Sequence, residues 1–453
     1  MPEENNQTKY NLGQTVSLSI RDLNHRGEGV GKADGFTLFV QGALPGETVT
    51  ASITKLHKSY GQAELISTEQ ISLHRIKPAC SHFSVCGGCS LQHLAYESQL
   101  TWKRSRVTEA LRRIAGLESA EEPVIGMQNP WHYRNKARIH LGMENGKVVG
   151  GFYRLGSKNI IDLKHCPVQH PLTEQLITSI RSALNTLVAE HNIEKALPVT
   201  GATIRTSFSA GRSLIVFHAA PGRTYIKILK KIASLIVEKS GDFIEGIVLM
   251  HHGKNSSGTT VLYGQPMLHE NIDPFKYRIS PLSFFQVNSR QAKVLYEKAV
   301  SLAGETRTAL DIFCGTGNFS LYLSQAAESV TGLDSSADAI RDAATNALLN
   351  NVNNVEFLKT RAEDITTKDL DKLHPLTIYL NPPRGGCPAS MLKTVTSAKA
   401  ERIIYISCNP ATLARDLAII KPAGYTVQSV QPIDMFPHTT HVETVVLMTR
   451  VKE

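Results

Sequence analysis

The stretch Ala309-Leu-Asp-Ile-Phe-Cys-Gly-Thr-Gly-Asn-Phe319 decides the fold class of this 453-residue chain. It begins as an apolar strand, passes through a turn with two glycines and ends where a helix is expected to start. Glycine has no Cβ, so this turn lets the backbone approach a ligand closely. Only two of the three glycines of the dinucleotide-binding pattern are present, which favours S-adenosylmethionine, a donor without a pyrophosphate, over NAD.

The sequence around this turn alternates between helices and strands from about residue 290 onward. The expected strands are TALDIF, SVTGLD, VEFLKT, LTIYL, RIIYIS and VVLMTR. Such alternation predicts a parallel, doubly wound sheet of the Rossmann-like α/β class. Asp334 ends the strand after the glycine turn, where a carboxylate can accept hydrogen bonds from the two ribose hydroxyls of an adenosine.

The first two thirds of the chain has a different pattern. Residues 9–67 read as about five short strands with a Gly-rich turn, which predicts a small OB-like β-barrel of a kind that often binds oligonucleotides. Residues 98–115 predict an amphipathic helix, with basic side chains around an apolar face of Leu100, Val107, Leu111 and Ile114. Residues 131–280 mix strands with helices near 171–191 and 224–239, an α+β pattern.

Charge and composition narrow the class of protein. Residues 1–300 hold 35 Lys+Arg against 24 Asp+Glu, whereas residues 301–453 hold 14 against 16. The excess of positive charge in residues 1–300 suggests a polyanionic partner, although a solvated basic surface is the alternative. The acidic, polar N-terminus and the lack of an 18-residue apolar run predict neither a secretory signal nor a membrane span. Seven cysteines are too few for a disulfide scaffold, so we expect a reducing, cytoplasmic location.

Three strand ends carry candidate catalytic groups. Asn381-Pro-Pro-Arg384 follows one strand, where an amide and rigid carbonyls can face a flat base, although Asn-Pro also marks simple turns. Cys408 ends the next strand, and we favour a nucleophile there over a buried apolar thiol. Glu443 precedes the last strand among apolar residues, as suits a base with a raised pKa. His438 and His441 beside it are read as packing residues rather than metal ligands.

These groups fit one reaction. C5 of a pyrimidine is a poor nucleophile until a thiolate adds to C6 and turns the ring into an enolate. A base must then remove the C5 proton so that the thiol leaves by elimination. One cysteine, one base and one bound methyl donor around a flipped nucleotide therefore suffice.

A second cysteine group lies near the front of the chain. Cys80, Cys86 and Cys89 are closely spaced, and Cys166 lies far downstream. Four thiolates can hold a four-iron cluster or a zinc ion, and we rank the cluster first because zinc sites more often show two paired CxxC knuckles.

Taken together, these motifs resemble the RNA uracil-5-methyltransferases over nearly the whole chain, most closely the bacterial 23S ribosomal RNA type. The resemblance implies a TRAM domain at 9–67, a 4Fe-4S cluster on Cys80, Cys86, Cys89 and Cys166, and donor contacts from Gln286, Phe313 and Asn318. ISCNP matches the nucleophile motif at Cys408, and HVETVVLM matches the base motif at Glu443. It also implies 23S ribosomal RNA as substrate, with RNA held partly by Tyr133-Arg134-Asn135-Lys136. We further expect a monomer with no membrane partner.

The resemblance also implies a domain division, and the chain departs from the family pattern at two positions. A central iron–sulfur and RNA-binding domain would comprise 74–97 and 121–280, and a catalytic domain 98–120 and 281–453. The family usually has Asp where this chain has Asn381, and commonly Glu where it has Asp334. Asp334 is expected to keep the ribose contact with a shifted reach. Asn381, which can still donate and accept hydrogen bonds but brings no charge, is expected among the donor-binding residues.

Three alternatives stay open. The RNA could be transfer RNA, although the simpler transfer-RNA enzymes of this family typically lack the TRAM-like segment and the cysteine cluster. Asn381-Pro-Pro could be the amino-group clamp of an N-methyltransferase, but that motif usually ends in an aromatic residue and needs no thiol. The chain could also be a non-catalytic RNA-binding scaffold.

Overall fold

The structure, a computed structural model, describes residues 9–118, 121–191, 197–219, 226–252 and 257–451. The chain divides into two compact units. One comprises Met1–Trp102 with Phe436–Thr440, and the other comprises Lys103–Met435 with His441–Glu453. In the described part of the chain, every helix is too short or too polar to cross a membrane.

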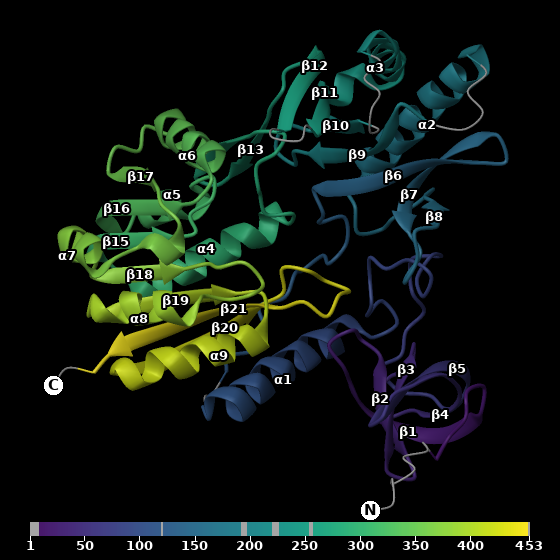
Figure 1. The fold of residues 1–453 in the computed structure, drawn as a ribbon, viewed down its shortest axis with the longest axis horizontal. Helices are drawn as coiled ribbons and strands as arrows, with labels where there is room; N and C mark the ends of the chain where they lie inside the picture. The colour runs from purple at the N-terminus through teal and green to yellow at the C-terminus, as the bar shows by residue number, and fades with distance from the viewer. Residues whose placement is uncertain (1–8, 119–120, 192–196, 220–225, 253–256, 452–453) are drawn as a thin grey trace, which may run out of the picture. The chain divides into compact units, whose positions relative to one another are not determined.

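The first unit contains a closed five-stranded barrel, as predicted. Its strands are β1 (Thr15–Leu23), β2 (Gly29–Ala33), β3 (Phe36–Gln41), β4 (Thr48–Leu56) and β5 (Tyr60–Gln70), paired in the order β1-β2-β3-β5-β4 (Figure 1). Alternate apolar side chains such as Leu38, Val40 and Val49 are fully buried inside it. Gly31 is needed at its position, because a Cβ there would lie 2.7 Å from both a Leu18 methyl group and the Ser19 carbonyl oxygen.

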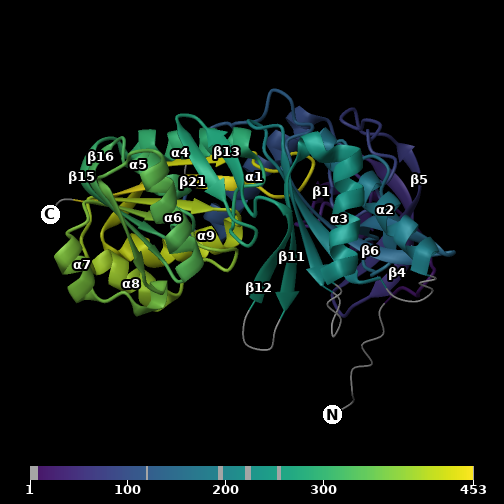
Figure 2. The same ribbon diagram turned by 90° about the horizontal axis from the view of Figure 1, so that it is seen from above.

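The second unit holds two sheets, the first of which is the predicted α+β region. Its order is β12-β11-β10-β9-β6-β7-β8. The strands are β6 (Lys136–Glu144), β7 (Lys147–Tyr153), β8 (Ile160–Asp162), β9 (Val199–Thr206), β10 (Ser213–Ala219), β11 (Ile244–His252) and β12 (Ser257–Gly264). Helices α2 (Pro171–His191) and α3 (Ile226–Ser240) pack side by side over this sheet (Figure 2). Residues 224–225 of the second expected helix lie outside the described residues.

The other sheet has the order β17-β16-β15-β18-β19-β21-β20 (Figure 1). Its strands are β15 (Thr306–Ile312), β16 (Ala327–Asp334), β17 (Val355–Lys359), β18 (Thr377–Leu380), β19 (Arg402–Ser407), β20 (Tyr425–Ile433) and β21 (Glu443–Arg450). The predicted parallel pairing holds from β17 to β19. β21 pairs antiparallel with β19 and β20, so the prediction of a parallel sheet was wrong at this edge. The residue composition of a strand does not by itself tell parallel from antiparallel pairing.

Helices and a hairpin complete this part of the second unit. They are β13 (Leu268–Ile272), β14 (Phe275–Ile279), α4 (Ser289–Ala303), α5 (Asn318–Leu323), α6 (Ala337–Leu349), α7 (Thr367–Leu373), α8 (Ala389–Ser397) and α9 (Pro410–Ile420). Short 3-10 turns lie at Gly241–Phe243, Ala362–Asp364 and Lys421–Ala423. Both faces of the central strands β18 and β19 are buried, which explains their continuous apolar sequences, whereas the edge strand β17 stays partly exposed.

Helix α1 (Tyr96–Ala115) extends the predicted helix by two residues at its start. Val107 and Leu111 are fully buried in the core of the β15–β18–β19 sheet, as the apolar face required. Two details of the prediction were wrong. Ile114 is 48% exposed, because it lies near the end of the helix. Lys103, expected on the polar side, is fully buried and donates a 2.6 Å hydrogen bond to Asp434.

Candidate active site

The candidate residues of the second unit converge at one edge of the β15-containing sheet. β15, β16, β18 and β19 run parallel, so their carboxyl ends meet at that edge. Phe313, Asp334, Asn381 and Cys408 each follow or end one of these strands. The strand order reverses at β15, the position where open α/β sheets form a ligand crevice.

The glycine turn after β15 requires its glycines. Phe313, Gly315 and Gly317 all have positive φ angles, of 72°, 57° and 76°. A Cβ on Gly317 would come within 2.9 Å of the Phe357 ring, so the turn is tight as well as left-handed. Helix α5 starts directly afterwards at Asn318.

Asp334 closes this turn. One carboxylate oxygen accepts from the Gly315 backbone amide at 3.0 Å, and the other accepts from the Ser336 amide at 2.8 Å. The side chain is thereby held beside the glycine turn. Each carboxylate oxygen keeps a further lone pair, so the group can still accept from a ribose hydroxyl.

Tyr296 on α4 links two residues that the sequence assigned to donor binding. Its hydroxyl hydrogen-bonds to the side chains of both Gln286 and Asn318, and burial raises its pKa well above the ordinary value. Asn135 holds the same segment, because its amide donates to the Gln286 carbonyl at 3.0 Å. Sequence reasoning missed Tyr296, which lies inside an ordinary amphipathic helix and carries no motif.

Cys408 and Glu443 lie at the paired ends of β19 and β21. Ser407 pairs with Thr444 in the antiparallel register, which puts the next residue, Cys408, across from Glu443. Burial raises the pKa of Glu443 to about 7. Burial, together with the nearby Glu443, raises the pKa of the Cys408 thiol to about 11.

Arg384 opposes both of these shifts. Its guanidinium lowers the pKa of Cys408, to which it also hydrogen-bonds, and lowers the pKa of Glu443 by its charge. It also donates to His441 Nε2 at 3.2 Å, and burial with this cation beside it lowers the pKa of His441 to about 4. His441 is therefore a neutral acceptor at pH 7. His438, the other histidine of the predicted pair, belongs to the first unit and contacts Gln99 there.

The loop carrying Arg384 is anchored by Asp416 on α9. The buried Asp416 carboxylate accepts from the Cys387 amide at 2.7 Å and from the Tyr405 hydroxyl. Gly386 has a φ of 74°, and a Cβ there would lie 2.5 Å from an Asp416 oxygen. The predicted motif Asn-Pro-Pro-Arg is thus followed by a tightly held turn, a role for Asp416 that no local sequence pattern signals.

Asn381 lies half-buried at the end of β18. Its backbone amide donates to the Ile312 carbonyl at 3.4 Å, which joins it to β15. Among the residues that the structure describes, its side-chain amide makes no hydrogen bond. That amide remains available to a ligand.

The cysteines of the proposed cluster divide between the units. Cys80, Cys86 and Cys89 are partly exposed in the first unit, and Cys166 is buried in the second. Burial and the nearby Cys80 raise the pKa of Cys86, whose sulfur accepts from the Gly88 amide at 3.4 Å. Backbone amides that donate to sulfur are a feature of iron–sulfur sites. The described residues contain no group of three or more His, Cys, Asp or Glu side chains already arranged around a metal position.

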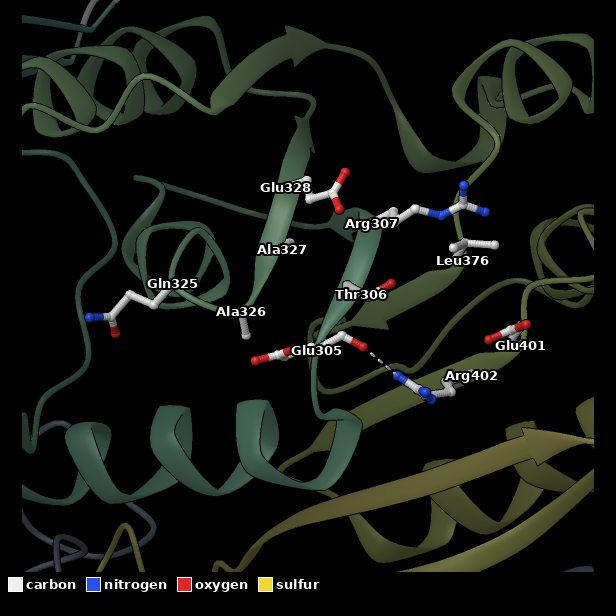
Figure 3. Close-up of a pocket in the computed structure, with 10 residues that line it drawn as sticks. All are labelled: Glu305, Thr306, Arg307, Gln325, Ala326, Ala327, Glu328, Leu376, Glu401 and Arg402. Carbon is white, nitrogen blue, oxygen red and sulfur yellow. Dashed lines mark hydrogen bonds between the residues drawn. The ribbon is translucent and has the colours of Figure 1, made fainter.

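A separate pocket lies at the opposite, amino-terminal edge of the same sheet (Figure 3). Its wall includes the start of β15 and β16, and Arg402 there donates to the Glu305 carbonyl at 2.9 Å. It is lined by Glu305, Thr306, Arg307, Gln325, Ala326, Ala327, Glu328, Leu376, Glu401 and Arg402. None of the predicted site residues lines it, so the candidate active site is the carboxyl edge.

Comparison with known proteins agrees with this geometry. Residues 95–451 match the family described as tRNA (Uracil-5-)-methyltransferase, and residues 9–66 match the TRAM domain. An uncharacterized RNA methyltransferase from Clostridium tetani is 39% identical over 96% of both chains, and one from Listeria innocua is 38% identical over 96% of this chain and 98% of its own. The crystal structure of Pyrococcus abyssi tRNA (uracil-54, C5)-methyltransferase with S-adenosyl-L-homocysteine is also similar. It has a TM-score of 0.74 and 27% identity, and the match covers 96% of this chain and 99% of that one.

Proposed function

We propose that this chain, which belongs to the family described as tRNA (Uracil-5-)-methyltransferase, methylates C5 of a uridine and that its substrate is 23S ribosomal RNA. It is an RNA (uracil-5-)-methyltransferase that uses S-adenosylmethionine. The observation that supports the chemistry most directly is Cys408 across from Glu443, beside Arg384. An N-methyltransferase or a non-catalytic scaffold would need no thiol and base in this arrangement.

The residues act in sequence on the uracil ring. Cys408 Sγ adds to C6, and the ring electrons move to O4 as an enolate. C5 is then nucleophilic enough to take the methyl group that S-adenosylmethionine supplies when bound. The Glu443 carboxylate removes the C5 proton, and the Cys408 thiolate leaves as the C5–C6 double bond forms again. Arg384 favours the ionised form of both groups.

We place the methyl donor and the uracil ring at the same carboxyl edge of the β15-containing sheet. We assign the donor to Gln286, Phe313, Asn318 and Asp334 around the glycine turn. Asn381, whose side-chain amide makes no hydrogen bond among the described residues, is assigned to the same donor pocket, at the side where its amide can also face the uracil ring and pair with O4 and N3–H. Phe284, two residues before Gln286 and 69% exposed, offers a ring on which a base can stack.

The choice of 23S ribosomal RNA rests on the barrel and the cysteine group. Transfer RNA is the second candidate, because the Pyrococcus tRNA enzyme matches this chain over nearly its full length. Mapping 5-methyluridine in ribosomal and transfer RNA from a deletion strain tests both. We expect loss of the nucleoside from 23S ribosomal RNA. Loss confined to transfer RNA would replace the substrate, and no loss from either RNA would contradict the function.

We further propose that Cys80, Cys86, Cys89 and Cys166 hold a 4Fe-4S cluster, and that the three-part domain division applies. The Gly88 amide directed at the Cys86 sulfur supports a thiolate at that position. Anaerobically purified protein should contain iron and sulfide, and Cys86→Ser should lose both. Cys387→Ser is the matched control, because that thiol is buried beside Tyr405. Equal iron in wild type and Cys86→Ser would contradict the ligand set.

We also propose that the enzyme acts as a monomer in the cytoplasm.

A further inference from the structure

Residues 280–284 connect β14 to the donor-binding segment, and none of their side chains is buried. Leu282 is 46% exposed and Phe284 is 69% exposed, so apolar packing does little to fix this stretch of chain. The stretch leads directly to Gln286, which we assign to the donor. Polar contacts must therefore hold it in place.

Asp342 on α6 makes two of these contacts. Its carboxylate is almost fully buried and accepts hydrogen bonds from the Ser280 hydroxyl at 2.8 Å and from the Ser283 hydroxyl. Hydrogen bonds to a carboxylate are stronger than those between two neutral groups. One buried side chain thus holds the chain on both sides of the exposed Leu282.

Asn346, one helical turn further along α6, contacts the opposite side of the donor pocket. Its fully buried amide donates to the Thr316 carbonyl of the glycine turn at 3.0 Å, and its oxygen accepts from the Arg278 amide of β14 at 2.8 Å. The Thr316 hydroxyl in turn donates to the Phe284 carbonyl at 3.4 Å. Because residues spaced by four share one face of a helix, Asp342 and Asn346 act from the same side of α6. That helix packs against both β14 and α5 (Figure 1).

We propose that Asp342 and Asn346 are positioning residues of the donor pocket. Asp342 fixes residues 280–284 ahead of Gln286, and Asn346 fixes the glycine turn. Helix α6 thereby sets the separation between the two groups of residues that bind S-adenosylmethionine. A pocket held in place before the donor arrives loses less conformational entropy on binding. This inference rests on the proposed function, which assigns the donor to this edge of the sheet.

The first test removes the same two hydrogen bonds from either side. Asp342→Ala removes the acceptor, and Ser280→Ala/Ser283→Ala removes both donors. The Kd for S-adenosylmethionine, measured by calorimetry, and the donor KM should rise about tenfold. The kcat at saturating donor should change less than about threefold, because the reacting groups are untouched.

Combining these changes shows whether they act through one interaction. The triple variant should bind the donor no more weakly than Asp342→Ala, since the bonds are already lost. Asp342→Asn should recover most of the affinity, because an amide can accept from one hydroxyl and donate to the other. Asn346→Ala tests the contact to the glycine turn and should raise the donor Kd in the same way.

Asn350→Ala is the matched control. Asn350 lies one further turn along α6, and its side chain bonds the Lys276 amide at 2.8 Å and the Lys276 carbonyl at 2.7 Å. In the described structure, none of its side-chain hydrogen bonds goes to residues 280–284 or to the glycine turn. Its replacement should therefore leave the donor affinity at the wild-type value.

Wild-type donor affinity in both Asp342→Ala and the serine double variant would show that the positioning role is wrong, and so would an equal loss in Asn350→Ala. The serine variant changes only partly buried side chains, so it decides the question even if Asp342→Ala does not fold. If the wild type binds the donor but methylates no RNA, the proposed function fails and the positioning role stands. If the wild type binds no S-adenosylmethionine, both fail.

Discussion

Cys408 and Glu443 face each other from the ends of two antiparallel strands, β19 and β21, although they lie far apart in the sequence. The thiol and the carboxyl are both partly or fully withdrawn from water, and each has a raised pKa. A nucleophile and a base that act on adjacent ring carbons need this proximity. The strand pairing therefore brings together the two groups that the proposed reaction requires.

Replacement of the thiol should stop the reaction but not donor binding. In Cys408→Ala no bond to C6 can form, so C5 stays unreactive and methylation should fall at least about a thousandfold. Methyl transfer from labelled donor measures the loss, and calorimetry with S-adenosylmethionine checks the fold. Turnover close to that of the wild type would rule out the covalent mechanism.

Replacement of the base should trap the adduct. Glu443→Gln leaves an amide that cannot take the C5 proton, so elimination stalls after methyl transfer. A covalent protein–RNA species should accumulate and migrate slowly on a denaturing gel. Cys408→Ala/Glu443→Gln is the control and should form none. A Glu443→Gln sample that lacks the adduct yet retains turnover would assign the base elsewhere.

Removal of Arg384 should move the pH profile. Glu443, with a pKa of about 7, serves as a base only when ionised, so the wild-type rate should rise as the pH increases through 7. Arg384→Gln removes the cation that lowers the pKa of both Glu443 and Cys408. Both active forms become scarcer at neutral pH, and kcat should fall by about tenfold or more, with recovery at higher pH.

Arg384→Lys keeps a charge and should recover part of the rate. Arg341→Gln, on the exposed surface of α6, is the control that should leave the profile unchanged. A profile of Arg384→Gln that superimposes on the wild type would mean that the guanidinium does not tune these groups.

The buried pair of Lys103 and Asp434 should dominate local stability. Both side chains are fully buried, so Lys103→Met leaves a carboxylate without its ammonium partner. The free energy of unfolding should fall by about 3–5 kcal/mol. Denaturant unfolding measures it, and Arg341→Gln should show no measurable change because that ion pair is exposed. Equal stability of Lys103→Met and the wild type would show that the pair adds nothing.

Local patterns determined much of this protein. Short β-rich segments and a Gly-rich turn region predicted the barrel strands, because strand-forming residues and glycine turns act locally. The apolar strand and two glycines at 309–319 predicted the tight turn between β15 and α5, since glycine adopts positive φ angles without strain. Cys408 and Glu443 were also predicted, because each lies at a strand end and matches a motif.

The tertiary structure alone decided the partners of these groups. Tyr296 hydrogen-bonds to Gln286 and Asn318 only once α4 packs on the sheet. Asp416 contacts the loop that carries Arg384 only because α9 packs beside that loop. Lys103 resembles any surface cation until a carboxylate 331 positions away is buried against it. Side-chain charge energies depend on burial and on distance in space, and neither is encoded in local sequence spacing.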